Sequence, residues 1–362
     1  MSRQFIESNV QYFFRAGTDF LFRRRHPGTI MLRIASALLL GLLAGMAFNI
    51  SIPTGSGTFA FSFSNGGTPN WLYIGVFGVA VLAFGIGIIW TSRALAAEGR
   101  KRVYAIELRG LRDTSGCPLY KAIPAGLEGR RDQLLINLRQ GQDGHISEPA
   151  AAIRKIAALP HDLETREQGI DRSDISYVLG GLAPVPLSFL TGVLTDDECA
   201  VTFMDWNRHH DRWSALDASD DGKRFVINGL DIVPSQASDV ALAVSVSYDV
   251  DLAGVALKLP NIPLVEMRLE DGTPDAHWSN EKQAAMGKQF LETLIKISNL
   301  GVGTIHLFMA AQNSVVLRFG RLYDKRNLPP IIVYQYERSQ TPPFAWGIRM
   351  PVAGSPDAAV VN

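Results

Sequence analysis

Two long apolar runs dominate the hydrophobic pattern of the first hundred residues. Residues 34–52 and residues 71–91 contain no charged side chain over 19 and 21 positions. A helix of about 20 apolar residues, rising 1.5 Å per residue, crosses the hydrocarbon core of a bilayer. Burial in a soluble core is the alternative, but both runs are apolar on every face. The first run begins too late for a signal peptide, and a second run follows it. The pattern predicts a transmembrane hairpin over residues 29–95.

Basic residues flank this hairpin at its two outer ends, whereas the loop between the spans, residues 51–70, has no charge. The basic residues are Arg23, Arg24, Arg25 and Arg33 before the first span, and Arg93, Arg100, Lys101 and Arg102 after the second. Basic flanks stay on the cytoplasmic side of a membrane. We therefore expect a multi-pass membrane protein whose two termini are both cytoplasmic.

The spans and the segment before them suggest how the chain uses the bilayer. Residues 1–28 place apolar side chains at helical spacing among arginines, which predicts an amphipathic helix at the membrane interface; a partly ordered tail is the alternative. Glycines punctuate both spans, at Gly41, Gly45, Gly75, Gly78, Gly85 and Gly87. Such residues let helices approach closely, although glycine is also simply common in membrane helices. Neither span holds an ionisable residue, and two helices cannot enclose a pore, so any membrane activity requires self-association.

The rest of the chain alternates short apolar runs with helical patterns. Strand-like runs occur at 102–111, 133–140 and 238–251, and strand–loop–helix–strand units at 176–206 and 304–337. Alternation of this kind predicts an α/β domain with largely parallel strands. Residues 1–102 hold ten basic and three acidic side chains, a net charge of about +7. Because the whole chain has a net charge of zero, the remaining domain has a net charge of about −7. A net acidic domain is a poor binder of DNA or RNA polymers.

The two strand–loop–helix–strand units match each other at an offset of 128 residues. Leu187 then falls on Val315 and Gly192 on Gly320, and the following strands share their apolar character. This match favours an internal duplication, although any two such units look alike to some degree. Ligands of parallel sheets bind beyond the carboxyl ends of the strands. Two related sheets would thus form one pocket from two rims, GGLAPVP at 180–186 and AAQNS at 310–314.

The C-terminal part of the chain also resembles a known family. The runs IHLFMAAQNSVVLRFGRL and PPIIVYQYE, at 305–322 and 329–337, are similar to the core of SAVED domains, and VALAVSVSYDVD looks like their repeated first strand. With the two spans ahead of it, the chain resembles the two-transmembrane SAVED effectors of bacterial cyclic-oligonucleotide antiphage signalling, CBASS. One departure is Gln312, where many members have proline.

The resemblance implies a fold and a function. SAVED domains are fusions of two CARF-like, Rossmann-like halves, which places the halves at 96–237 and 238–337. The remaining C-terminal tail, 338–362, is rich in proline and alanine from Ser339 onward, and this composition leads us to expect it to be irregular. They bind a cyclic di- or trinucleotide made by a partner nucleotidyltransferase after infection. Binding drives oligomerisation, and the effector arrests the cell in abortive infection. Here the expected effector is the hairpin, disrupting the bacterial inner membrane.

Candidate ligand-binding residues lie on the two rims, on the first strand of the second half, and before a helix. They are Gly180, Gly181 and Ala183; Ala311, Gln312, Asn313 and Ser314; Ser247 and Tyr248; and Trp278. Amide and hydroxyl groups can read bases or phosphates, and helix N-termini favour phosphate, but Asn313 and Ser314 could instead simply cap a helix. Tyr248 could stack on a base or pack within a strand. Trp278 is a candidate lid aromatic.

Other chemistry is not indicated. The sequence contains no P-loop, HExxH or GxSxG motif, so we expect no catalytic residue, cofactor or metal. Adjacent His209 and His210 point apart on a strand, and His306 on an apolar strand reads as a core histidine. Cys117 and Cys199 form no redox motif. Two rival hypotheses stay open: a membrane-tethered phosphodiesterase that degrades the messenger, and a tether that binds no nucleotide.

Overall fold

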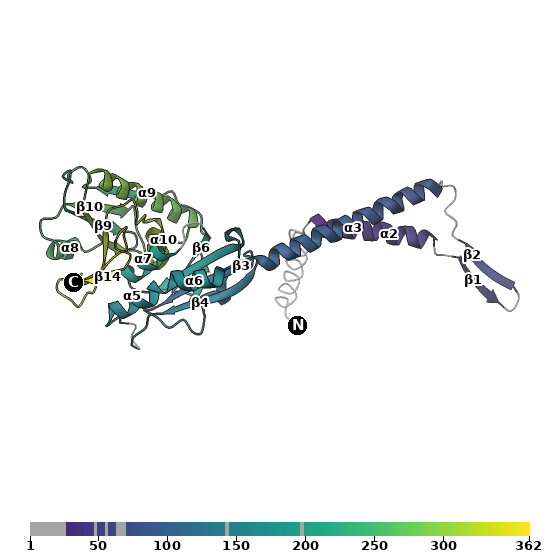
Figure 1. Ribbon diagram of the computed structural model, residues 1–362, viewed down its shortest axis with the longest axis horizontal. Helices are drawn as coiled ribbons and strands as arrows, with labels where there is room; N and C mark the ends of the chain where they lie inside the picture. Colours follow the sequence, from purple (N-terminus) through teal and green to yellow (C-terminus); the bar gives the residue numbers. More distant parts are fainter. Residues whose placement is uncertain (1–26, 47–48, 55–56, 63–69, 142–144, 196–198) are drawn as a thin grey trace, which may run out of the picture. The chain divides into compact units, whose positions relative to one another are not determined.

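The computed structural model describes residues 27–46, 49–54, 57–62, 70–141, 145–195 and 199–362, and these form two compact units. The first unit is Met1–Gly99 and the second is Arg100–Asn362 (Figure 1). The amphipathic segment predicted at 1–28 lies outside the described residues except for its last two positions. Each unit is described separately below.

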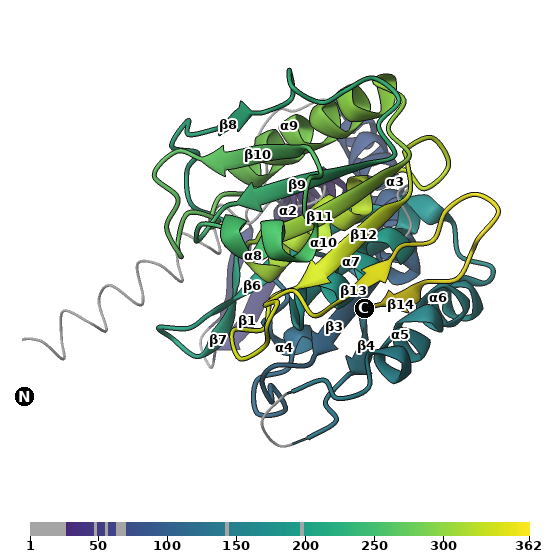
Figure 2. The same ribbon diagram turned by 90° about the vertical axis from the view of Figure 1, so that its left-hand side faces the viewer.

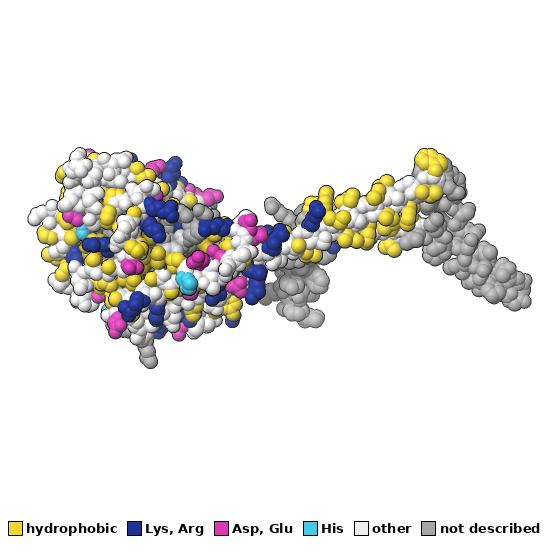
Figure 3. Space-filling view, in the orientation of Figure 1, with side chains coloured by type: hydrophobic (Ala, Val, Ile, Leu, Met, Phe, Trp, Pro, Cys, Tyr) yellow, Lys and Arg dark blue, Asp and Glu magenta, His cyan; other side chains and the backbone are white. Residues whose placement is uncertain are grey.

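The first unit contains two helices, α2 (Pro27–Met46) and α3 (Asn70–Arg100), and an antiparallel pair of strands, β1 (Asn49–Thr54) and β2 (Gly57–Ser62). Among the described residues one helix is long and apolar enough to cross a membrane, over Ile74–Arg100. Only 11% of its most apolar part is buried within the protein, and apolar side chains stand out along it (Figure 3). The apolar part of α2, Pro27–Leu42, is shorter.

The predicted first span is wrong at its C-terminal end. Residues 49–52 belong to β1 and not to a helix that continues to residue 52. The run from Asn49 to Pro53 alternates Ile50 and Ile52 with polar residues, and β-branched side chains in alternation favour a strand. Pro53 also lacks the N–H that a helix interior needs.

Two glycines bring the helices of the first unit together. A Cβ on Gly28 would lie 2.8 Å from the hydroxyl oxygen of Thr91, and a Cβ on Gly87 would lie 2.9 Å from Cγ of Leu32. A different set of glycines, Gly41, Gly75, Gly78 and Gly85, has no atom within 4 Å of the Cβ position. The surroundings of Gly45 lie outside the described side chains. Of the predicted glycines with described surroundings, only Gly87 therefore makes a close approach within the hairpin.

The second unit contains two mixed β-sheets with helices packed on them (Figure 2). The five-stranded sheet has the order β4-β3-β5-β6-β7, and the seven-stranded sheet has the order β14-β13-β12-β11-β9-β10-β8. The strands of the first sheet are β3 (Arg102–Arg109), β4 (Arg130–Asn137), β5 (Ile175–Leu182), β6 (Ala200–Asn207) and β7 (Arg212–Ala215). Those of the second are β8 (Phe225–Asn228), β9 (Asp239–Ser245), β10 (Leu264–Leu269), β11 (Thr304–Ala310), β12 (Ile331–Gln335), β13 (Trp346–Arg349) and β14 (Ala359–Val361).

The helices follow the strands much as the alternating pattern predicts. They are α4 (Leu119–Ala122), α5 (Pro149–Ala157), α6 (Leu159–Glu167), α7 (Val185–Leu194), α8 (Leu252–Lys258), α9 (Asn280–Asn299) and α10 (Asn313–Leu322), with a 3₁₀ turn at Arg172–Asp174. The N-cap of α9 is Ser279, whose hydroxyl accepts a hydrogen bond from the backbone N–H of Lys282. Pro186 lies in the first turn of α7, where its missing N–H has no cost.

The two sheets share one strand order and one backbone geometry. In each, four parallel strands lie in the order second, first, third, fourth, as β4-β3-β5-β6 and β10-β9-β11-β12. After the first strand, two consecutive N–H groups donate to the last carbonyl of the third strand. These are Gly110 and Leu111 to Leu182, and Val246 and Ser247 to Ala310. That the sheets arose as fused CARF-like halves stays a prediction.

Helices α7 and α10 cross at two glycines and join the sheets into one core. A Cβ on Gly192 would meet the carbonyl oxygen of Leu317, and a Cβ on Gly320 would meet that of Phe189. The contact is reciprocal, and it uses the glycine pair that the offset of 128 matches. Next to the crossing, Phe319 of α10 stacks on Phe290 of α9 with ring centroids 4.5 Å apart. One continuous buried cluster therefore includes side chains from both sheets.

The expectation of an irregular tail after residue 337 is wrong. Strand β13 pairs antiparallel with β12, and β14 pairs with β13. The segment alternates buried Trp346, Ile348 and Met350 with exposed Arg349 and small Gly347, which is the period of a strand. Strand β8, which lies within the range predicted for the first half, pairs with β10 of the second sheet.

Candidate functional site

The carboxyl ends of the parallel strands in both sheets border a single cavity of about 940 Å³. The first sheet contributes residues at and after the ends of β5 and β6, and the second sheet those after β9, β11 and β12. The lining includes Leu182, Val185, Asp205, Trp206, Arg208 and His209 from the first sheet. From the second part it includes Ser247, Tyr248, Asp249, Asp251, Asp275, His277, Trp278, Ala310, Ala311, Gln312, Asn313, Gln335, Tyr336, Arg338 and Phe344.

Six of the ten residues predicted from sequence line this cavity. They are Ser247, Tyr248, Trp278, Ala311, Gln312 and Asn313. Tyr248 is 63% exposed, and together with Tyr336 and Trp278 it gives the cavity aromatic faces on which a planar base can stack. Whether these side chains contact a ligand stays a prediction.

The other four predicted residues are buried away from the cavity. Gly180 and Gly181 lie inside β5, where a Cβ on Gly180 would lie 2.9 Å from the ring of Trp213 and a Cβ on Gly181 would lie 3.1 Å from Leu108. Ala183 and Ser314 are fully or almost fully buried. The strand extends further than the sequence suggests, so the first rim begins at Leu182.

Asn313 connects the two rims and does not act as a helix cap. Its side-chain oxygen accepts a hydrogen bond from the backbone N–H of Ala183, at 3.3 Å, and another from the hydroxyl of Ser188. Ser314 is also no cap, because its hydroxyl accepts from the side-chain amide of Gln283 at 2.8 Å. The capping interpretation of these residues is therefore wrong.

Helices α7 and α10 are instead each capped by a side chain from the opposite sheet. Asp205, on β6, accepts from the N–H of Ser314 at the start of α10, at 3.0 Å. Gln335, on β12, accepts from the N–H of Val185 at the start of α7, at 3.1 Å. These two contacts satisfy N–H groups that a helix cannot satisfy internally. Sequence reasoning missed both, because the partners are far apart in the chain.

Unpaired polar atoms are concentrated around this cavity. Within the described residues five buried side-chain nitrogen or oxygen atoms have no hydrogen-bond partner. Four of the five belong to cavity-lining residues: Nε1 of Trp206, both ring nitrogens of His277, and Oε1 of Gln312. An unpaired buried polar group costs about 1–3 kcal/mol, so a ligand that pairs with these atoms recovers that free energy. Trp206 supplies a hydrogen-bond donor, Gln312 an acceptor, and the imidazole of His277 one of each.

His277 is the most deeply placed ionisable group in this set. Its side chain is 4% exposed, and its Nε2 lies 3.6 Å from a carboxylate oxygen of Asp205, which is too long for a hydrogen bond. Burial lowers the pKa of His277 below its usual value, outweighing the opposite effect of the Asp205 charge. Its ring lies against Trp278, with centroids 4.3 Å apart. The imidazole is thus neutral at pH 7 and presents one N–H and one bare nitrogen.

We expect His277 to make the second unit less stable as the pH is lowered. Because the folded pKa is lowered, the unfolded chain takes up the proton first, so the contribution of His277 is present above about pH 6.5 and is lost below it. Thermal unfolding of wild type and of His277→Asn between pH 7.5 and 5.5 measures this. The wild type should lose more stability over that interval than the variant. Parallel losses in the two proteins would contradict the assignment.

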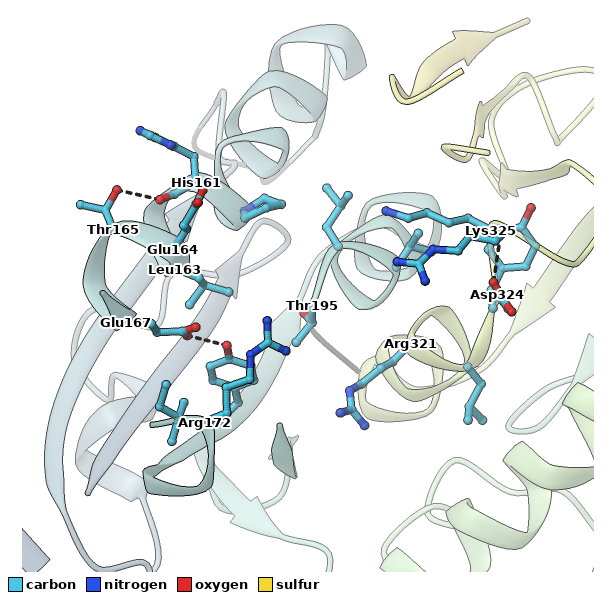
Figure 4. A pocket seen from close by; sticks show the side chains of 18 of the residues that line it. His161, Leu163, Glu164, Thr165, Glu167, Arg172, Thr195, Arg321, Asp324 and Lys325 are labelled. Atoms are coloured by element: carbon cyan, nitrogen blue, oxygen red, sulfur yellow. Dashed lines mark hydrogen bonds between the residues drawn. The ribbon is translucent and has the colours of Figure 1, made fainter. Parts of the chain in front are cut away.

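A second large cavity, of about 990 Å³, lies at the other end of β5 (Figure 4). It is lined by Ile175 at the start of that strand, and its charged side chains come from α6, from the 3₁₀ turn that contains Arg172, and from the end of α10 and the loop after it (Figure 4). Tyr177 there donates its hydroxyl to Glu167, and burial raises the pKa of Tyr177. None of the ten predicted residues lines this cavity. The carboxyl-end cavity is therefore the candidate site, as parallel sheets favour.

The second unit is thus an α/β domain with a composite cavity, and it follows a unit with a long apolar helix. Residues 159–350 match the SAVED family, described as the SMODS-associated and fused to various effectors sensor domain. Residues 7–153 match a SAVED-fused 2TM effector domain. The first match covers more than half of the 362 residues, so the chain belongs to the SAVED family. The effector match makes it a membrane protein.

A search of solved structures gives matches of low identity. Two are of the Acinetobacter baumannii Cap4 SAVED/CARF-domain containing receptor, with the cyclic trinucleotides 2′3′3′-cAAA and 3′3′3′-cAAA. They show 11% and 12% identity and a TM-score of 0.46, covering 78% of this chain and 60% of the receptor chain. The Moraxella osloensis Cap4 receptor shows 10% identity and a TM-score of 0.42, covering 100% of this chain and 86% of the other. This chain thus spans 60% of the length of the first two. No curated protein matches it.

Proposed function

We propose that this protein is an antiphage membrane effector that senses a cyclic di- or trinucleotide. The ligand, made by a partner nucleotidyltransferase, binds in the carboxyl-end cavity of two fused CARF-like halves. Binding favours an assembled state over the free one, and assembly brings the transmembrane helices of several copies together. The gathered helices then disrupt the bacterial inner membrane, with both termini of each chain in the cytoplasm.

One observation carries the sensing part of this proposal. A single cavity receives residues from the carboxyl ends of both sheets, and its lining residues include several aromatic side chains and carry four polar atoms without a hydrogen-bond partner. Its volume falls within the range of about 300–1,000 Å³ that is usual for small-molecule sites. Nucleotides offer the complementary groups, namely flat bases that stack and polar edges that hydrogen-bond.

The membrane part of the proposal uses the glycines that the hairpin leaves unpacked. Gly75, Gly78 and Gly85 of α3 are spaced by three and seven residues, so they share one helix face. No described atom lies within 4 Å of the Cβ position on any of them. Small residues on a lipid-exposed face let a second helix approach closely. We assign this face to contact between copies in the assembled state.

Dye release from liposomes that contain the full-length protein tests this function. The ligands are 3′3′3′-cAAA and a panel of cyclic dinucleotides, with assembly followed by chemical cross-linking. One of these ligands should bind, assemble the protein and release dye, and Gly78→Leu with Gly85→Leu should lower release without changing affinity. Assembly on sealed vesicles would contradict membrane disruption, and failure of every ligand to bind would contradict sensing. A linear product in the same reaction would favour the phosphodiesterase alternative.

A further inference from the structure

The register of the two sheets identifies equivalent residues at the ends of β6 and β12. Val178 of β5 pairs with Thr202 of β6, and His306 of β11 pairs with Ile332 of β12. Val178 and His306 are 128 residues apart, as the matched helices are, whereas Thr202 and Ile332 are 130 apart. The fourth strands are therefore equivalent at an offset of 130, two more than the rest of the unit.

This offset matches three cavity-lining positions in one sheet with three in the other. Asp205 corresponds to Gln335, Trp206 to Tyr336, and Arg208 to Arg338, and all six line the cavity. The first pair also acts equivalently, since each member caps the helix of the opposite sheet. Asp205 and Gln335 therefore correspond in their structural contacts and not only in the sequence alignment. At this offset the two arginines are matched, each lies in the turn that follows its strand, and both line the cavity.

The carboxylates of the cavity are already engaged within the protein. Asp205 accepts from Ser314, Asp249 pairs with Arg268 at 3.0 Å, Asp251 accepts from the N–H of Gly254, and Asp275 accepts from the indole of Trp278. The hydrogen bond from Trp278 lowers the pKa of Asp275, and His209 lies 3.6 Å from the same carboxylate. Each of these four carboxylates therefore has a partner within the protein, which for Asp249 is an arginine.

Arg208 and Arg338 are different, because no hydrogen bond or ion pair holds either of them in the described part of the chain. Both are exposed, and both line the cavity. Guanidinium groups bind phosphate oxygens through two parallel N–H donors, a geometry that lysine cannot reproduce. Two such groups at equivalent places suit a ligand that carries two phosphates in equivalent settings.

We propose that Arg208 and Arg338 each bind one phosphate of the ligand, so that the site reads a pair of phosphodiesters across the two sheets. This inference rests on the proposed function and adds the residues that make the cavity selective for an oligonucleotide over a mononucleotide. The neighbouring aromatics differ, since Trp206 is 6% exposed and Tyr336 is 43% exposed. The bases beside the two phosphates therefore meet different surroundings even though the arginines are equivalent.

The test measures the affinity of the full-length protein in nanodiscs for 3′3′3′-cAAA, cyclic dinucleotides and AMP. Arg208→Gln and Arg338→Gln should each weaken binding of the cyclic ligand about tenfold or more, and the double variant about a hundredfold or more. Each substitution should also make the affinity for the cyclic ligand less dependent on salt concentration, because an arginine–phosphate charge pair is removed. Arg208→Lys and Arg338→Lys should recover part of the affinity. Arg349→Gln, at the exposed last residue of β13 and outside the cavity, is the matched control and should bind like wild type.

The outcomes separate this inference from the proposed function. If the wild type binds a cyclic ligand and either glutamine variant binds equally well, the phosphate pair is wrong and the sensing function stands. The phosphate pair is also wrong if only one of the two arginine variants loses affinity for the cyclic ligand, or if the wild type binds AMP as tightly as it binds the cyclic ligand. If the wild type binds no cyclic ligand, the proposed function fails and the phosphate pair fails with it.

Discussion

Replacement of Gly320 by alanine is expected to destabilise the second unit by about 3 kcal/mol, which lowers its melting temperature by about 6–12 °C. The added Cβ would meet the backbone of Phe189, with the carbonyl carbon 3.0 Å away, and backbone atoms of a packed helix cannot move aside singly. The crossing of α7 and α10 would have to open instead. Circular dichroism of the protein during thermal unfolding measures the change.

The sign of this effect distinguishes packing from helix propensity. Alanine in a helix interior is more favourable than glycine by about 0.5–1 kcal/mol, so propensity alone predicts a gain in stability. Gly126→Ala, in a turn, is the control for the added methyl group itself, because no atom lies within 4 Å of its Cβ position. We expect this control to melt within about 2 °C of wild type. A Gly320→Ala protein as stable as wild type would show that the helices do not cross as described.

Replacement of Leu82 by arginine is expected to abolish ligand-triggered dye release while leaving ligand affinity unchanged. Leu82 lies near the centre of the apolar run of α3 and is 67% exposed, so it faces away from the other described residues. A charged side chain at the centre of a membrane helix costs about 2.5–3.5 kcal/mol on insertion scales. That cost disfavours the inserted helix, on which the proposed disruption depends.

A conservative change at the same position provides the control. Leu82→Ile keeps the apolar surface and should release dye at the wild-type rate, provided that both variants are reconstituted to the same density. Release by Leu82→Arg at that rate would mean that α3 does not act from within the hydrocarbon core. Reduced ligand affinity in either variant would mean that α3 contributes to the binding site.

Periodicity and alternation predicted the membrane unit and most of the α/β unit because they report local burial. Residues 304–322 form β11 and α10 as expected, and the match of Gly192 with Gly320 identified the pair that meets at the helix crossing. The strand signal at 346–350 was equally visible, as Trp346, Ile348 and Met350 alternate with other residues. The composition around this signal, rich in proline and alanine, favours an irregular tail instead.

The part of the site that sequence reasoning missed depends on contacts between distant residues. Asp205 and Gln335 read as ordinary strand ends, because nothing near them in the chain shows that each will cap a helix of the other sheet. His277 lies in a short polar segment with no periodicity, and only the folded chain places it in the cavity. The arginine pair could have been predicted from the sequence, since WNR at 206–208 and YER at 336–338 stand at the ends of equivalent strands. The offset of 128 does not align these arginines, because the connection from α10 to β12 is two residues longer than the connection from α7 to β6.

The reciprocal capping of α7 and α10 bears on how such a domain can change over time. If one sheet were exchanged for that of a distant homologue, the resident helix would keep its hydrophobic contacts but its first N–H would face a side chain chosen for another partner. Recombination between the sheets would therefore produce chimaeras with a defect at the rim of the cavity itself. The two sheets are expected to diverge as an inseparable pair, and a change at one strand end is best compensated at the helix start across from it.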